Sequence, residues 1–78
     1  MNAPTTPHVF DVSAQDFDAR VLQKSHELPV LGDFWAAWCA PCRMLTPVLV
    51  RLTQRYGGKF LLAKVDTDAE RELAARYG

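Results

Sequence analysis

Short apolar runs along the chain predict three strands. Residues 30–36 are nearly all apolar, as expected for a strand that is covered on both faces of a sheet. Residues 59–65 form a second apolar run, and residues 8–12 alternate weakly, which is typical of a short edge strand. Residues 1–7 contain two prolines and two threonines without periodicity, so we expect a flexible arm there and a single domain over residues 8–78.

Apolar residues at helical spacing predict three helices between and after these strands. The first covers residues 13–25, and Ser13 is its expected cap. The second covers residues 39–56, with Pro47 inside it, where we expect a kink. The third begins at a capping box formed by residues 67–70. The apolar stripe predicted on one side of the second helix consists of Leu45, Val48, Leu49, Leu52 and Tyr56.

The predicted strands and helices alternate along the chain with short links between them. This order implies parallel strands joined by right-handed crossovers, and therefore an α/β fold. A chain of 78 residues buries only about 60 to 65% of the surface that it exposes when unfolded. We therefore expect the core to leave a small margin of stability.

Nine basic and nine acidic side chains give the chain a formal net charge of zero. This balance argues against a nucleic-acid or anionic-membrane surface. No stretch approaches the roughly 18 apolar residues of a membrane helix, and the N-terminus lacks the basic and apolar regions of a secretory leader. We therefore expect a cytoplasmic protein that has neither nucleic acid nor membrane as a partner. In a reducing compartment, two cysteines are more often catalytic or metal-binding than structural.

These two cysteines form a Cys-Ala-Pro-Cys motif where the strand of residues 30–36 meets the helix of residues 39–56. The first turn of a helix offers unpaired N–H groups and the positive end of the helix dipole, and both stabilise a negative sulfur. We therefore expect Cys39 to ionise readily and to attack a substrate disulfide. Cys42, one turn later, is then expected to be sheltered from solvent and to resolve the mixed disulfide.

Two other interpretations of the cysteines stay open, namely half of a zinc site and inert core cysteines. A zinc site needs about four ligands. The chain has no second cysteine pair, and His8 and His26 lie in an arm and a loop without ligand spacing. We therefore expect neither a metal ion nor another cofactor.

The segments DFWA at residues 33–36 and WCAPCRM at residues 38–44, followed by Pro47, resemble the thioredoxin family, and the likeness extends over about residues 8–78. Within that family, the N-terminal pattern is most similar to the thioredoxin-like domains of bacterial co-chaperones. The resemblance implies the N-terminal βαβαβα part of a thioredoxin-like fold, with a parallel three-stranded sheet in the order 1-3-2 and helices on both faces. It also implies a truncated chain, because the cis-proline loop and the C-terminal ββα are lacking.

In such a truncated fold, the strand of residues 30–36 has one neighbour fewer and becomes an apolar edge. An unpaired apolar edge invites pairing and aggregation. Gly32 stands where the family normally has an aliphatic residue, and a glycine inside a strand weakens it. We therefore expect a fragment, or a dimer or swapped oligomer that covers this edge.

Asp33 and Lys64 are the charged residues that the resemblance places near the cysteines. A carboxylate within an apolar strand is unfavourable unless it is paired or protonated. The resemblance implies that Asp33 is a buried proton acceptor behind Cys42, and the alternative is a strand-end aspartate bonded to backbone N–H groups or water. Lys64 matches a family lysine near that aspartate, and the alternative is a lysine that faces solvent.

Three residues around the cysteines are expected to contact substrate. Trp38 precedes the first thiol and is expected to form the wall of a peptide groove, whereas Trp35 is expected in the core. Pro41 stiffens the first helical turn and removes one hydrogen-bond donor. Ala40 stands where typical thioredoxins have glycine.

The resemblance implies a thiol-disulfide oxidoreductase that reduces protein disulfides and receives its electrons from thioredoxin reductase. A second interpretation is a co-chaperone module that binds unfolded client proteins with little or no reductase turnover. A third is an inactive fragment. The first predicts catalytic turnover, and the other two do not.

Overall fold

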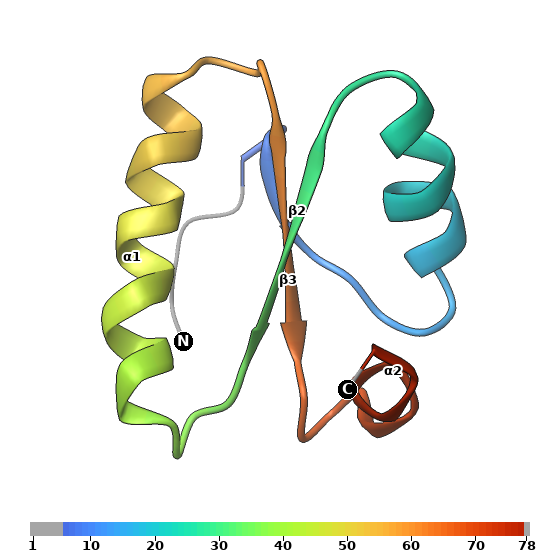
Figure 1. Ribbon diagram of the computed structural model, residues 1–78, viewed down its shortest axis with the longest axis vertical. Coiled ribbons are helices and arrows are strands. Elements are labelled where there is room, and N and C mark those ends of the chain that lie inside the picture. The colour runs from blue at the N-terminus through green and yellow to red at the C-terminus, as the bar shows by residue number, and fades with distance from the viewer. Residues whose placement is uncertain (1–5, 78) are drawn as a thin grey trace.

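The computed structural model describes residues 6–77, which form a parallel sheet with helical segments on both faces (Figure 1). The strands are β1 (Val9–Asp11), β2 (Val30–Trp35) and β3 (Leu61–Asp66), in the order β1-β3-β2. The helical segments are η1 (Asp18–Gln23), η2 (Lys24–His26), α1 (Ala40–Arg55) and α2 (Arg71–Tyr77). The predicted fold class and strand order are confirmed. The arm predicted at residues 1–7 lies, apart from residues 6 and 7, outside the described residues.

The sheet divides the core into two clusters, because α1 lies on one face and η1, η2 and α2 lie on the other (Figure 1). On the α2 face, the buried side chains are Phe10, Val12, Phe17, Leu61, Ala63, Val65 and Leu73. On the α1 face, they are Val9, Val50 and Leu62, with Leu49 partly buried beside them. The α1 face therefore depends on a small number of apolar contacts.

β2 occupies one edge of the sheet. It pairs with β3 alone among residues 6–77, whereas residues 61–65 of the central strand are all buried. Leu31 is 43% exposed and Gly32 is also exposed, while Asp33 and Trp35 are buried. The expectation that this run is covered on both faces is therefore wrong for its first half, where two consecutive residues, which point to opposite faces of the sheet, are exposed. The expected apolar edge is confirmed.

α1 packs on the sheet through a row of small side chains, Thr46, Val50 and Thr53, all of them buried. The predicted stripe is therefore wrong except for Leu49. Its other members are exposed: Leu45 (52%), Val48 (41%), Leu52 (40%) and Tyr56 (52%). Small residues let the helix approach the sheet closely, and a three-stranded sheet is too narrow to cover the larger side chains next to them. Pro47 lies inside α1, as predicted.

The entry to η1 is a turn closed by Asp16. One Asp16 carboxylate oxygen accepts hydrogen bonds from the backbone N–H of Ser13 (2.7 Å) and from its hydroxyl (3.2 Å), so the predicted Ser13 cap is wrong. Burial raises the pKa of Asp16, but these hydrogen bonds and the Arg20 guanidinium outweigh it, and the pKa lies below its ordinary value. The ionised form therefore stabilises the fold at neutral pH, and this contribution is lost as the pH falls through the lowered pKa.

The turn before α2 is capped by Asp66, at the end of β3. Its carboxylate accepts hydrogen bonds from the N–H groups of Asp68 (3.0 Å) and Ala69 (3.3 Å). The Glu70 carboxylate accepts instead from the N–H of Ala14 at 2.9 Å. The capping box predicted at residues 67–70 is therefore wrong, because its two donors bind backbone carbonyls instead: the N–H of Thr67 donates to Trp35 and the N–H of Glu70 to Asp66. No helix within residues 6–77 has the length and apolar character needed to span a membrane.

α1 ends at two glycines, as predicted. Gly57 and Gly58 both have positive φ, 55° and 93°, and side chains are strained in that region. A Cβ at Gly58 would also lie 2.7 Å from the imidazole Nε2 of His8. The turn therefore requires glycine at Gly58 because of its backbone conformation, and a side chain there would also displace the His8 imidazole.

Candidate functional site

The cysteine pair lies where β2 gives way to α1. Cys39 has an extended backbone (φ −94°, ψ 103°) and is the N-cap of α1, and its N–H donates to the carbonyl of Ala36 at 3.0 Å. Its Sγ accepts a hydrogen bond from the N–H of Cys42 at 3.3 Å. The first thiol is therefore placed at the end of the helix where unpaired donors and the helix dipole favour a thiolate.

Cys39 and Cys42 are joined in a disulfide, with their Cα atoms 5.2 Å apart. Both residues are half-buried. Because Cys39 is the N-cap of α1 and Cys42 lies in its first turn, the two sulfur atoms are close enough to bond. The backbone at the start of α1 therefore accommodates a disulfide between these two cysteines.

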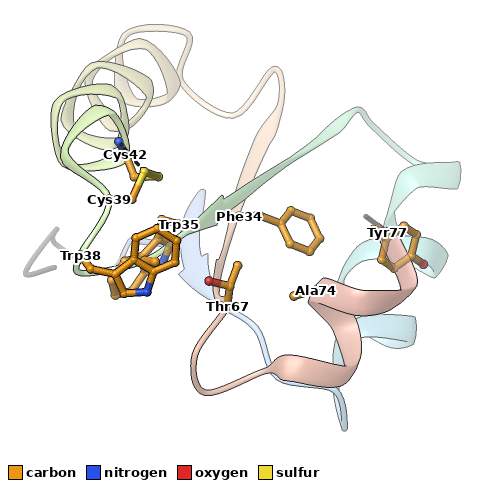
Figure 2. A pocket seen from close by; sticks show the side chains of 9 residues that line it. Phe34, Trp35, Trp38, Cys39, Cys42, Thr67, Ala74 and Tyr77 are labelled. Carbon is orange, nitrogen blue, oxygen red and sulfur yellow. Dashed lines mark hydrogen bonds between the residues drawn. A yellow bond between two sulfur atoms is a disulfide. The ribbon is translucent and has the colours of Figure 1, made fainter.

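An open cleft of about 430 Å³ adjoins the disulfide. Figure 2 shows Trp35 and Trp38 next to the sulfur atoms, with Phe34, Ala74 and Tyr77 further along the cleft. This lining is mainly apolar and aromatic. The cleft therefore offers contact area for an apolar polypeptide segment beside the sulfur atoms.

Trp38 is 73% exposed, and its indole N–H donates to the Asp68 carboxylate at 3.3 Å. Ala40 and Pro41 are exposed next to it, in the first turn of α1. Trp35 is buried, and its indole nitrogen has no hydrogen-bond partner among residues 6–77. The structure thus brings the predicted substrate-binding residues to one surface and places Trp35 beneath it.

Asp33 is buried on the α1 face of the sheet, with 6% of its surface exposed. One of its carboxylate oxygens, Oδ2, accepts a hydrogen bond from the hydroxyl of Thr46 at 2.6 Å. Thr46 is fully buried and follows Cys42 by four residues on α1, so both side chains lie on the same face of the helix. The carboxylate is therefore paired by a side chain and not, as one alternative proposed, by backbone N–H groups.

Lys64 is 2% exposed, so the alternative of a lysine that faces solvent is wrong. In the sheet it lies in register with Asp33 on β2 and with Asp11 on β1. Its ammonium nitrogen pairs with the Asp11 carboxylate at 3.5 Å. The structure therefore places Lys64 beside Asp33 in the same row, with its ion pair directed to the opposite neighbour.

Sequence reasoning missed two residues of the site, Thr46 and Asp68. A threonine four residues after Cys42, within an otherwise apolar stretch, is a signal that could have identified Thr46. Asp68 contacts Trp38 across 30 residues of sequence, and no local pattern indicates such a pair. Across the described residues, no group of His, Cys, Asp and Glu side chains gathers in a way that could hold a metal ion.

Comparisons with known proteins agree on one family. The family model of thioredoxin matches residues 8–78. Thioredoxin of Synechocystis sp. is 48% identical over 73 residues, which cover 94% of this chain and 64% of that protein. Thioredoxin 1 of Nostoc sp. is 45% identical over 67 residues, covering 86% and 61%. Thioredoxin of Bacillus subtilis is 51% identical over 49 residues, covering 63% and 47%. The chain therefore spans less than two thirds of the length of these relatives.

Proposed function

Because the chain belongs to the thioredoxin family, we propose that it is a thiol-disulfide oxidoreductase that reduces protein disulfides. The observation that carries the proposal is the hydrogen bond from the Cys42 N–H to Cys39 Sγ at the start of α1, beside an open apolar cleft. A donor aimed at this sulfur stabilises the thiolate, which is the attacking species.

The reaction has two exchange steps. In the reduced chain, the Cys39 thiolate attacks a substrate disulfide, forms a mixed disulfide and releases one substrate thiolate. Cys42 then loses its proton, attacks Cys39 Sγ and displaces the second substrate thiolate, which leaves the Cys39–Cys42 disulfide. Two electrons pass from the dithiol to the substrate, and solvent protonates the released thiolates.

Asp33 is the proposed proton acceptor for Cys42 in the second step. Its burial on the α1 face and its hydrogen bond to a residue one turn after Cys42 support this role. Lys64 is the proposed cation that partly offsets the buried charge of Asp33, since the two lie in register on β2 and β3. The ion pair of Lys64 with Asp11 limits this contribution.

The proposed substrates are disulfide-bearing, extended or unfolded segments with apolar side chains. Trp38, Ala40 and Pro41 form the proposed wall against which such a segment lies, and the aromatic cleft supports the apolar preference. Thioredoxin reductase is the proposed electron donor, by family membership, and the cytoplasm is the proposed compartment.

A second candidate function is client binding with little turnover, as in a co-chaperone module. Its support is the 73% exposed Trp38 next to an open apolar cleft, which suits capture of unfolded segments. Reduction of insulin separates the two functions. With thioredoxin reductase and NADPH, we expect NADPH consumption and precipitation of the insulin chains at catalytic concentrations of this protein. Binding of insulin without NADPH consumption would favour the client-binding module.

We also propose that two copies associate through the β2 edge. Its support is the side of β2 that pairs with no other strand among residues 6–77, together with the exposed Leu31. Sedimentation velocity at increasing concentration is expected to detect a dimer, and Leu31→Lys is expected to return the chain to monomer by placing a charge at the edge. Sedimentation of the parent chain as a monomer at every concentration would contradict the proposal.

A further inference from the structure

The hydrogen bond between Thr46 and Asp33 joins α1 to the buried carboxylate. The Thr46 hydroxyl donates to Oδ2 at 2.6 Å, and both residues are buried, at 0% and 6% exposure. No other donor among residues 6–77 lies within hydrogen-bond distance of this carboxylate. One carboxylate oxygen is thus held, and the other, Oδ1, is free to accept a proton.

The charged and titratable groups around Asp33 come from three elements. Cys42 lies on α1 one turn before Thr46, Lys64 lies in register on β3, and Asp11 lies beyond it on β1. The Lys64 ammonium is paired with Asp11 at 3.5 Å. The Thr46 hydroxyl is therefore the group that contacts the Asp33 carboxylate directly.

We propose that Thr46 is a positioning residue for the resolving step. By donating a hydrogen bond to Oδ2, it holds and orients the Asp33 carboxylate, so that Oδ1 takes the proton from the Cys42 thiol. The inference rests on the proposed function, because it assigns a partner to the proposed proton acceptor. A donor to a carboxylate favours the ionised form over the neutral acid.

The resolving step replaces one disulfide bond with another and transfers one proton. The Cys42 S–H bond breaks, its proton passes to Asp33 Oδ1, and the sulfur electron pair forms the bond to Cys39 Sγ. The bond between Cys39 Sγ and the substrate sulfur breaks, and the substrate leaves as a thiolate that solvent protonates. Asp33 then returns its proton to solvent. Thr46 keeps its own proton throughout.

Thr46→Val tests the inference, because valine keeps the shape of the side chain and removes the donor. Reduced chain is mixed with the chromogenic disulfide dithionitrobenzoate in a stopped-flow instrument, where attack releases the first nitrothiobenzoate and resolution releases the second. We expect the acid limb of the pH profile of resolution to move up by about one to two pH units in Thr46→Val. Thr46→Ser, which keeps a hydroxyl, is expected to restore the parent profile.

Thr53→Val is the matched control. Thr53 is also fully buried on α1, but its hydroxyl donates to the carbonyl of Leu49 at 2.8 Å. We expect this variant to lose stability to a similar extent and to keep the parent pH profile. If the profiles of Thr46→Val and Thr53→Val coincide, while Asp33→Asn slows resolution, the inference is overturned and the role of Asp33 stands.

Asp33→Asn separates the inference from the proposed function. Resolution at the parent rate in this variant would overturn both the proton-acceptor role and the inference, whereas the initial attack by Cys39 would still report on the reductase activity. If Thr46→Val does not fold, NMR of the parent chain decides. We expect a Thr46 hydroxyl proton that exchanges slowly and whose chemical shift follows the Asp33 titration. A rapidly exchanging hydroxyl with no such dependence would contradict the inference.

Discussion

A chain that carries Cys42→Ser is expected to become covalently trapped on its substrates. The Cys39 thiolate would still attack, because its position at the α1 N-cap and the donor N–H of residue 42 are backbone features that serine preserves. Without the second thiol, however, the mixed disulfide has no internal path to resolution. We expect insulin reduction to fall to the background of the reagents. Mass spectrometry under non-reducing conditions is expected to show an adduct that dithiothreitol removes.

Cys39→Ser is the matched control for this experiment. It removes the attacking sulfur and leaves Cys42 half-buried inside the first turn of α1. We expect no turnover and little adduct, because the remaining thiol is not the one that accepts the helical N–H. Equal trapping by the two variants would show that the proposed roles of attacking and resolving cysteine are wrong.

The second large effect is expected in the core. Leu62 is fully buried on β3, the central strand of the sheet, and belongs to the small cluster with Val9 and Val50 that holds α1 on the sheet. Leu62→Ala is expected to lower the free energy of unfolding by about 2 to 5 kcal/mol. A domain of this size has about 4 to 12 kcal/mol in total. Urea unfolding followed by circular dichroism measures the loss, and the far-UV signal shows whether the variant remains folded without denaturant.

Leu45→Ala provides the comparison for that measurement. Leu45 is of the same residue type, but it lies on α1 with 52% of its surface exposed. We expect its replacement to change stability by less than about 0.5 kcal/mol. A loss of stability as large as that of Leu62→Ala would mean that Leu45 is buried in solution, although it is exposed in this structure.

The sequence was sufficient to predict the elements that have strong local signals. The apolar runs identified β2 and β3 within one or two residues at each end, and the paired glycines marked the end of α1. The alternation of strands and helices identified the parallel sheet. The motif identified the position of the cysteines at the helix start, because cap geometry and spacing are local properties.

What the sequence could not provide depends on contacts between distant residues. The buried face of α1 was predicted wrongly because the larger apolar side chains, such as Val48 and Leu52, resemble a core stripe. The contact with the sheet is made instead by Thr46, Val50 and Thr53. The caps before η1 and α2 differ from prediction because the carboxylates of Asp16 and Asp66, and not the side chains of Ser13 and Thr67, accept the hydrogen bonds at these turns. Lys64 lies between apolar residues in the sequence, as a solvent-facing lysine in a strand would. Only its position on β3, the central strand of the sheet, explains that it is buried.

The placement of the two tryptophans gives the molecule a natural optical reporter. Trp35 and Trp38 are the two tryptophans of the chain. Both line the cleft beside the disulfide (Figure 2). One indole is enclosed by protein and the other is in water, so their emission differs in colour and in access to soluble quenchers. All tryptophan fluorescence of this chain therefore originates within one corner of the molecule. An experimenter can follow events at the sulfur atoms without attaching a dye.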